Sequence, residues 1–96
     1  MRAQRPQPNE VFGHRLRELR RSKKLTQEQI AEAADLGVNI VGRLERAVIA
    51  PGLVTLLKLS VALGVTVHDL LDSFTPELVA QMKLGATLAG SRRRRR

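Results

Sequence analysis

The apolar residues of this chain recur with the 3.6-residue period of α-helices, in short blocks that end at turn-forming residues. The 96 residues include two Phe and no Trp, Tyr or Cys, so the core must be built from Leu, Val, Ile and Ala. Such aliphatic side chains favour packed helices over an aromatic-rich sheet sandwich. A chain of this length has room for one domain of about 100 residues. We therefore expect an all-α bundle of five helices with an additional sixth helix at the C-terminus.

Capping and turn residues divide the periodic region into predicted helices. These helices span residues 10–23, 26–34, 38–46, 53–63, 66–73 and 75–90. Thr26 and Gln29 fit a capping box, in which each side chain accepts a hydrogen bond from the other residue's backbone N–H. Gly64 follows the fourth helix, where a left-handed conformation costs glycine least. The fourth helix is apolar on most sides and is expected at the centre of the core, whereas the sixth is too thinly apolar to be stable without a surface to lie on.

Charge is distributed unevenly along the chain, whose formal net charge is +8. Residues 1–24 carry eight Lys or Arg and two Glu, residues 25–91 carry four basic and seven acidic residues, and residues 92–96 are all Arg. The middle is therefore mildly acidic between basic flanks, which predicts an anionic partner, foremost nucleic acid. We expect residues 1–9 to form a disordered arm, residues 10–74 the main domain, and residues 91–96 a disordered arginine tail.

Several functions are disfavoured by what the sequence lacks. No stretch approaches the ~20 apolar residues of a membrane span, and no hydrophobic run follows the first basic residues, as a secretory signal requires. No nucleophile, base and orienting group can be assembled, so we expect no catalytic residues and no enzyme. His14 and His68 are too few and too far apart to suggest a metal site, and no cofactor is expected. These features favour a cytoplasmic protein, associated with the nucleoid when bound to DNA.

The second and third predicted helices carry the signature of a helix-turn-helix, two short helices joined by a tight turn that contains glycine. From Phe12 to Leu71 the chain resembles the phage repressor and Cro type of helix-turn-helix domain, also called the xenobiotic-response-element family. The resemblance is carried by the stretches Leu16-Arg17-Glu18-Leu19-Arg20, Leu25-Thr26-Gln27-Glu28-Gln29-Ile30-Ala31, Val41-Gly42-Arg43-Leu44-Glu45-Arg46, Leu56-Leu57-Lys58-Leu59 and Ala62-Leu63-Gly64-Val65-Thr66.

The resemblance implies how such a domain would contact bases. The second helix of the motif lies in the major groove with its N-terminal residues at the base edges, while the first helix crosses the backbone. Asn39 can pair with adenine and Arg43 with guanine, each for about 1–3 kcal/mol of discrimination. The base-contacting positions of the family fall on Gly37, Val38, Asn39 and Arg43.

Phosphate contacts are expected from three places. Gln27 and Arg46 match backbone-contacting positions of the family. Thr26 lies beside Gln27 at a helix N-terminus, where backbone N–H groups and the helix dipole favour an anion. In the tail we assign Arg92, Arg93 and Arg94 to the DNA backbone, with contact to RNA or to anionic lipid as the alternatives. Five other basic residues are expected to form a solvated face, with a phosphate contact by some of them as the alternative; they are Arg15, Arg17, Arg21, Lys23 and Lys24.

The resemblance also implies an ion pair between Arg20 and Glu45, which would fix the orientation of the first helix against the recognition helix. Members of the family usually carry glycine after the recognition helix, where this chain has Ala47, at a cost of up to about 1 kcal/mol if the backbone there is left-handed. The recognition helix is unusually apolar and has Gly42 in its middle. An exposed apolar surface of this kind often marks a protein partner.

Two classes of function follow. The leading hypothesis is a sequence-specific, double-stranded-DNA-binding transcriptional regulator that binds a pseudo-palindromic operator as a homodimer, with half-sites ~34–36 Å apart. Its dimer interface is predicted on the last two helices, residues 75–90 included, at Leu70, Leu71, Phe74, Leu78 and Met82. The alternative is an adaptor or antitoxin-like protein, anchored non-specifically by the tail, that binds a protein partner through Val38, Ile40, Val48 and Ile49. Binding of the tail to anionic membranes is disfavoured, because nothing amphipathic and basic flanks it.

Overall fold

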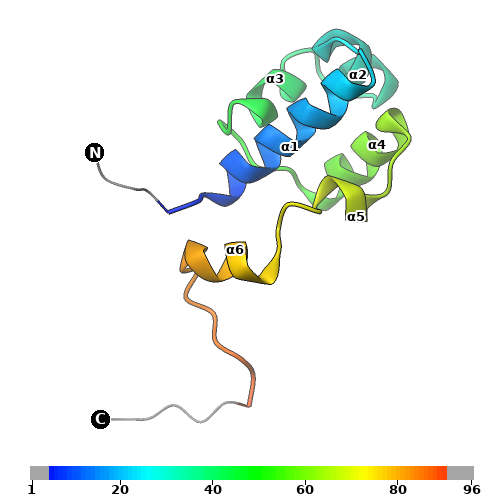
Figure 1. Ribbon diagram of the computed structural model, residues 1–96. Helices are drawn as coiled ribbons and strands as arrows, with labels where there is room; N and C mark the ends of the chain where they lie inside the picture. The colour runs from blue at the N-terminus through cyan, green and yellow to red at the C-terminus, as the bar shows by residue number, and fades with distance from the viewer. Residues whose placement is uncertain (1–4, 91–96) are drawn as a thin grey trace.

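The structure, a computed structural model, describes residues 5–90 and contains six α-helices in that range, with no strand among these residues (Figure 1). The helices are α1 (Pro8–Ser22), α2 (Gln27–Ala33), α3 (Ile40–Glu45), α4 (Leu53–Leu63), α5 (Val67–Leu70) and α6 (Pro76–Met82). The expected all-α fold, five helices followed by a sixth, is confirmed.

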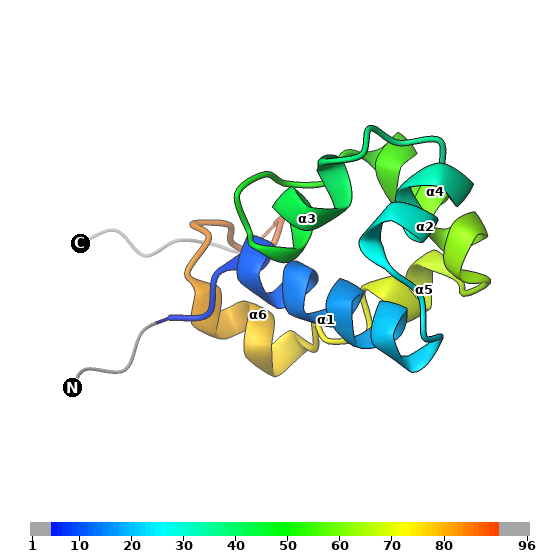
Figure 2. The same ribbon diagram turned by 90° about the horizontal axis from the view of Figure 1, so that it is seen from above.

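The long helix α1 is the element around which α2 to α5 are arranged. It packs against α3 and α5, while α2 packs against α3 and α4, so that the helix-turn-helix pair lies across one side of α1 (Figure 2). Their shared core is aliphatic apart from one ring, as the composition requires, and consists of Phe12, Leu16, Ile30, Ala31, Ala34, Val41, Leu44, Leu59, Leu63 and Leu70. Each of the larger side chains contributes about 1.5–3 kcal/mol by leaving water.

The predicted helix caps are present. The Gln29 backbone N–H donates to Thr26 Oγ1 at 3.0 Å, and the Thr26 N–H donates to Gln29 Oε1 at 2.8 Å, so both halves of the capping box are made. Gly64 follows α4 with φ of 68°, in the left-handed region. A second capping box joins Thr66 to Asp69 before α5, where the hydrogen bonds from Thr66 hold the pKa of the Asp69 carboxyl below its ordinary value. Local sequence therefore determines where α2 and α5 begin and where α4 ends.

Three predicted helix boundaries are wrong. Helix α1 begins at Pro8, so residues 8 and 9 do not belong to an arm; proline is favoured at the first helical position because its missing N–H would have no partner there. Helix α3 begins at Ile40 instead of Val38, because the Ile40 N–H closes a turn onto the Gly37 carbonyl at 3.0 Å. Helix α5 ends at Leu70, three residues early. Residues 1–4 of the predicted arm, and the arginine tail, lie outside the described residues.

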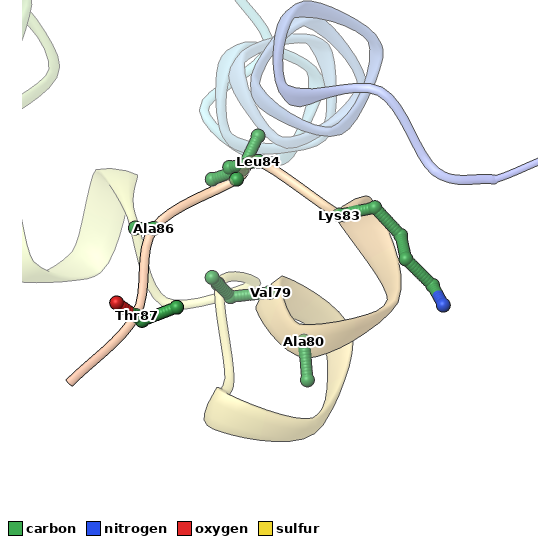
Figure 3. A pocket seen from close by; sticks show the side chains of 7 residues that line it. Val79, Ala80, Lys83, Leu84, Ala86 and Thr87 are labelled. Atoms are coloured by element: carbon green, nitrogen blue, oxygen red, sulfur yellow. The ribbon is translucent and has the colours of Figure 1, made fainter. Parts of the chain in front are cut away.

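The sixth helix is much shorter than predicted. It is capped by Thr75 as expected, yet it ends at Met82 instead of continuing to residue 90. Lys83 is left-handed with φ of 57°, and Gly85 follows with φ of 91°, so the chain turns away from the helix axis. Glycine is a poor helix former, and little else in the molecule packs on this segment to compensate. The segment runs back beside α6 and leaves a pocket lined by Val79, Ala80, Lys83, Leu84, Gly85, Ala86 and Thr87 (Figure 3).

Helix α4 does not lie at the centre of the core. Leu59 and Leu63 on one face are buried, whereas the opposite face is open to solvent. The exposed side chains are Leu53 at 69%, Val54 at 65%, Leu57 at 49% and Val61 at 80% exposure, a set that we call the α4 surface. The helix is apolar on both faces, so its sequence does not reveal which one is covered.

A glycine that the sequence analysis did not single out sets the distance between α1 and α3. Gly13 is buried in the middle of α1, and a Cβ atom there would lie 2.5 Å from the Leu44 carbonyl oxygen and 2.7 Å from that of Glu45. Both neighbours are backbone atoms and cannot move aside as a flexible side chain can. The absence of a side chain at Gly13 is therefore a condition for the observed packing of the recognition helix.

We predict that Gly13→Ala lowers the free energy of unfolding by about 1–3 kcal/mol, because the added methyl forces the two helices apart. Thermal unfolding followed by circular dichroism measures the effect. Gly37→Ala is the matched control, since its Cβ would meet only the Ile40 side chain at 3.5 Å, an ordinary contact. An unchanged midpoint for Gly13→Ala would contradict the steric argument.

Candidate nucleic-acid interface

The turn between α2 and α3 sets the geometry of the helix-turn-helix. Asp35 is left-handed with φ of 55°, and the Leu36 N–H donates to the Ala31 carbonyl at 2.8 Å, which closes the end of α2. The Leu36 side chain packs against the core and pins the turn from inside. On α3 itself, Val41 and Leu44 are buried, so the opposite side of this short helix must face solvent.

The four residues predicted to contact bases lie in α3 and in the turn before it. Gly37, Val38 and Asn39 lie in the turn that leads into α3, Arg43 lies one helical turn into it, and all four are exposed. Asn39 is the N-cap residue of α3, but its side chain makes no capping hydrogen bond, so its amide is not occupied by the helix end. All four residues are therefore accessible to solvent, and Asn39 and Arg43 lie one turn apart, since the Arg43 N–H donates to the Asn39 carbonyl at 3.1 Å.

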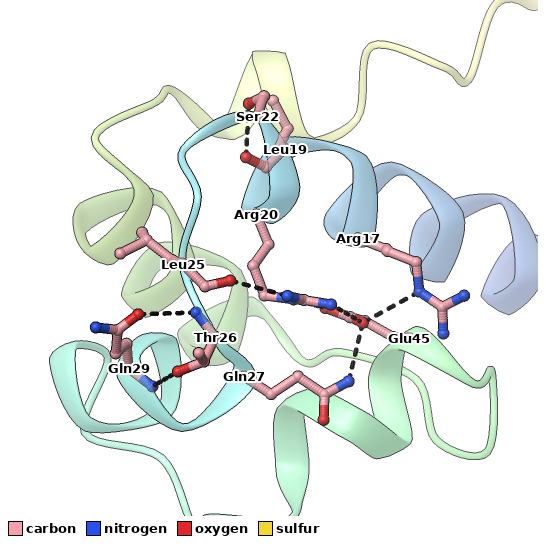
Figure 4. Close-up of polar contacts among 9 residues, drawn as sticks. All are labelled: Arg17, Leu19, Arg20, Ser22, Leu25, Thr26, Gln27, Gln29 and Glu45. Atoms are coloured by element: carbon pink, nitrogen blue, oxygen red, sulfur yellow. Dashed lines mark hydrogen bonds and ion pairs between the residues drawn. The ribbon is translucent and has the colours of Figure 1, made fainter.

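The carboxylate of Glu45, the last residue of α3, joins this helix to α1 (Figure 4). Its side chain is completely buried. Arg20 Nε donates to Glu45 Oε2 at 2.6 Å and Arg20 Nη2 donates to Oε1 at 3.0 Å, which is the two-pronged pairing that a guanidinium and a carboxylate form best. The remaining Arg20 Nη1 donates to the Leu25 carbonyl at 2.8 Å. The pair that the resemblance implies is therefore tied to the loop before α2 as well.

Two further side chains donate to the same carboxylate. Gln27 Nε2 donates to Glu45 Oε1 at 3.0 Å, and Arg17 Nε approaches the same oxygen at 3.3 Å. Burial alone would raise the pKa of Glu45, but the hydrogen bonds from Arg20, Gln27 and Arg17 together with the charge of Arg20 outweigh it, so the pKa lies below its ordinary value. The hydrogen bond to Glu45 in turn raises the pKa of Arg20. Glu45 is therefore an ionised group that three helices share.

Gly42 has a role that its position in the helix did not reveal. A Cβ atom at Gly42 would lie 3.1 Å from Arg46 Nη1 and 3.2 Å from Gln27 Oε1. The bare backbone therefore lets these two predicted phosphate-contacting side chains come together over α3. Gly13 and Gly42 could have been found from sequence, because glycine inside a predicted helix costs about 0.5–1 kcal/mol and suggests a close approach.

The loop after α3 is apolar and partly exposed. Ala47 is left-handed with φ of 63°, the conformation for which the family usually uses glycine. Of the four residues assigned to the adaptor hypothesis, Val38 and Val48 are more than half exposed, whereas Ile40 and Ile49 pack against the core. The apolar surface available there is therefore smaller than predicted.

The predicted dimer interface needs correction. Leu70 has no exposed surface and Met82 has 6%, so neither side chain can contribute area to a partner. Phe74 and Leu78 are partly exposed, with Phe74 packed against the core, and Leu71 is the exposed member of the set. The largest exposed apolar group on the described residues lies instead on the α4 surface.

Other sites predicted from sequence can be placed only in part. Thr26 and Gln27 lie at the start of α2, next to the recognition helix, whereas Arg92, Arg93 and Arg94 lie outside the described residues. Within residues 5–90, no three His, Cys, Asp or Glu side chains come together as a metal site would require. None of the helices in the same range has the length and apolarity needed to traverse a membrane.

These features define a helix-turn-helix transcription regulator, and sequence comparison agrees. A family model described as Helix-turn-helix matches residues 16–70, so the chain belongs to the Cro and phage repressor type of helix-turn-helix family. The chain is 47% identical over 58 residues to the HTH-type transcriptional regulator DdrOP3 of Deinococcus deserti. That match covers 60% of this chain and 45% of the relative, so the chain spans less than half of that protein.

Solved structures give the same family. The restriction-modification controller protein C.AhdI of Aeromonas hydrophila is 42% identical, with a TM-score of 0.63 over 65% of this chain and 94% of that one. The clp gene regulator ClgR of Corynebacterium glutamicum is 28% identical, with a TM-score of 0.71 over 81% of this chain and 83% of that one. These similar proteins are described as regulators and not as enzymes.

The lowered pKa of Glu45 predicts acid sensitivity. Its contribution to stability is present above the unfolded-state value of 4.5 and is lost as the pH falls through the lower folded-state value. We expect Glu45→Gln to cost about 3 kcal/mol or more at pH 7, because Arg20 loses its buried counter-charge, and to flatten the loss of stability in acid. Denaturant unfolding between pH 7 and pH 3 measures both effects.

Glu18→Gln is the matched control for this experiment. Glu18 forms an exposed pair with Arg15 at 3.1 Å, and its removal should change stability by less than about 1 kcal/mol. If Glu45→Gln retained the full acid dependence of the wild-type protein, another carboxyl would be responsible for it.

Proposed function

We propose that this protein is a sequence-specific transcriptional regulator that binds double-stranded DNA with α3 in the major groove. The observation that carries the proposal is the exposure of Gly37, Val38, Asn39 and Arg43 around the N-terminal end of α3, a helix whose Val41 and Leu44 are buried. These residues offer base-edge partners at the N-terminal end of the recognition helix, where this motif uses them. Acting on chromosomal DNA, the protein would work in the cytoplasm and associate with the nucleoid.

Each of these residues has a definite chemical role in the proposal. Arg43 donates to guanine and Asn39 pairs with adenine. Val38, which is 64% exposed, offers a methyl contact to thymine, and Gly37 lets the turn approach the groove. On either side, Thr26, Gln27 and Arg46 contact phosphates and hold the helix in register, which adds affinity without sequence information. Arg92, Arg93 and Arg94 add non-specific backbone attraction.

We expect selection from a random-sequence duplex pool to enrich a pseudo-palindrome whose half-sites lie one helical turn apart. Arg43→Ala should weaken binding to the selected duplex by about 1–3 kcal/mol and relax the preference at one base pair in each half-site. Fluorescence anisotropy against the selected duplex and its single-base variants provides the measurement.

Lys83→Ala is the control for Arg43→Ala, since it removes the same charge from an exposed residue beyond α6. It should leave the base preference unchanged. Recovery of no motif, together with binding that disappears uniformly as salt rises, would contradict the regulator and favour the adaptor hypothesis.

We propose further that the regulator is a homodimer and that the α4 surface takes part in the contact between the two copies. The spacing of Val54, Leu57 and Val61 forms one stripe along α4, which can pack against its own copy across a two-fold axis. At its edge Lys58 Nζ donates to the Asp35 carbonyl at 3.0 Å and lies 3.9 Å from the Asp35 carboxylate, which is fully exposed. Opposite charges at the rim suit an isologous contact, because Lys58 of one copy can face Asp35 of the second copy. The exposed apolar area is modest, so the free dimer should be weak.

We predict that the double substitution of Leu57 and Val61 by Glu shifts the protein toward monomer and reduces affinity for the palindrome while leaving half-site binding intact. Both side chains are exposed, so the fold should tolerate the charges. Sedimentation equilibrium measures the shift. The double substitution of Leu71 and Leu78 by Glu is the comparison on the interface predicted from sequence. Dissociation of the dimer by that variant alone would assign the interface to α5 and α6. A wild-type protein that binds the palindrome as a monomer would exclude the homodimer.

A further inference from the structure

Arg17 is the member of the Glu45 cluster whose charge reaches solvent. Its side chain is 41% exposed, whereas that of Arg20 is 11% exposed and that of Glu45 is fully buried. Only Arg17 Nε is directed at the carboxylate, and the two terminal nitrogens of the guanidinium extend away from it (Figure 4). From sequence Arg17 was one of five basic residues expected on a solvated face, with phosphate contact as the alternative; in the structure its Nε is held by Glu45 of the recognition helix.

The cluster does not need Arg17 in order to be balanced. Arg20 already neutralises Glu45 with two hydrogen bonds, and Gln27 supplies a third donor. The carboxylate therefore orients the Arg17 guanidinium without cancelling the net charge of the cluster, which remains positive. A positive group that is held in place and still hydrated is suited to bind an anion.

The groups around Arg17 point to a phosphate as that anion. Arg17 and Gln27 donate to the same oxygen, Glu45 Oε1, so their side chains are immediate neighbours. Gln27 Oε1 and Arg46 Nη1 both lie beside the backbone of Gly42. Arg17 thus extends the proposed row of backbone contacts, Arg46 and Gln27, from the motif onto α1.

The charges of α1 itself agree with this. A shallow hollow on that helix is lined by His14, Arg17, Glu18 and Arg21. Glu18 is the acidic residue among them, and its carboxylate is engaged by Arg15 Nη1 at 3.1 Å. The face that Arg17 shares is therefore basic.

We propose that Arg17 contacts the phosphate backbone of bound DNA, and that Glu45 is the positioning residue that holds Arg17 and Gln27 side by side for this contact. The inference rests on the proposed function and adds α1 to the surface that meets DNA. Glu45 then has two roles, since the carboxylate that fixes the recognition helix against α1 also orients two backbone contacts from different helices.

The experiment compares full-length wild-type protein with Arg17→Gln and Arg21→Gln on the selected duplex over a range of salt concentrations. Arg21 is the matched control, because it is an exposed arginine one turn along the same helix. Arg17→Gln should lower affinity about tenfold for every sequence alike, the effect of losing a charge-assisted hydrogen bond, and should reduce the slope of log K against log salt by about 1. Arg21→Gln should lower affinity by less than about threefold, since a screened charge without a direct contact contributes little. Both variants should remain folded at the temperature of the binding assay, as circular dichroism would show.

Arg17→Lys tests the positioning by Glu45. Lysine keeps the charge but lacks the planar fork that can donate to Glu45 and to a phosphate at once. Its affinity should therefore stay near that of Arg17→Gln. Full wild-type affinity in Arg17→Lys would show that charge alone suffices and would overturn the role of Glu45.

The remaining outcomes separate this inference from the proposed function. Equal affinities and salt slopes for Arg17→Gln and Arg21→Gln, with wild-type protein bound to its duplex, would overturn the assignment of Arg17 and leave the regulator intact. A change in base preference with an unchanged slope would also overturn it. Failure of wild-type protein to bind any duplex would instead contradict the proposed function, and this inference with it.

Discussion

The buried carboxylate of Glu45 is the interaction on which the arrangement of the helix-turn-helix depends. Side chains from α1 and α2 converge on it from both sides, and it lies on the recognition helix itself. An unpaired charge in this position would be strongly unfavourable, whereas the paired charge tolerates few other orientations of the helices. The cluster therefore gives α3 a definite direction relative to α1, which a smooth aliphatic contact would define less sharply.

Close packing makes this convergence possible. Gly13 lets the backbone of α1 touch that of α3, and Gly42 leaves room for Gln27 and Arg46 above the recognition helix. Each glycine weakens its helix slightly when considered alone. In both places glycine lowers helix propensity but allows a close contact that a side chain would obstruct. The two glycines therefore contribute to the packing of the site and not to the stability of their own helices.

A chain of this size cannot bury all of its apolar residues, and four of the exposed large ones lie on one helix. The α4 surface lies on the face opposite Leu59 and Leu63, so α4 is both a core helix and an apolar outer surface. Small domains bury a smaller fraction of their surface than large ones do, which makes such an excess expected. Its concentration in one stripe is the feature that favours a partner, because apolar residues scattered singly over a surface need no explanation.

Sequence alone determined the helical class, the aliphatic core, the bounds of α4 and the caps at Thr26, Gly64 and Thr75, because these depend on residues within one or two turns of each other. The resemblance to a family added the pair between Arg20 and Glu45. Tertiary structure decided which face of α4 is covered and that α6 ends at Met82. It also decided that Arg17 and Gln27 share one oxygen of Glu45. Arg17 is 28 positions from Glu45 in sequence, and Gln27 is 18 positions from it. Such contacts depend on how the helices cross, and helix periodicity carries no information about the crossing.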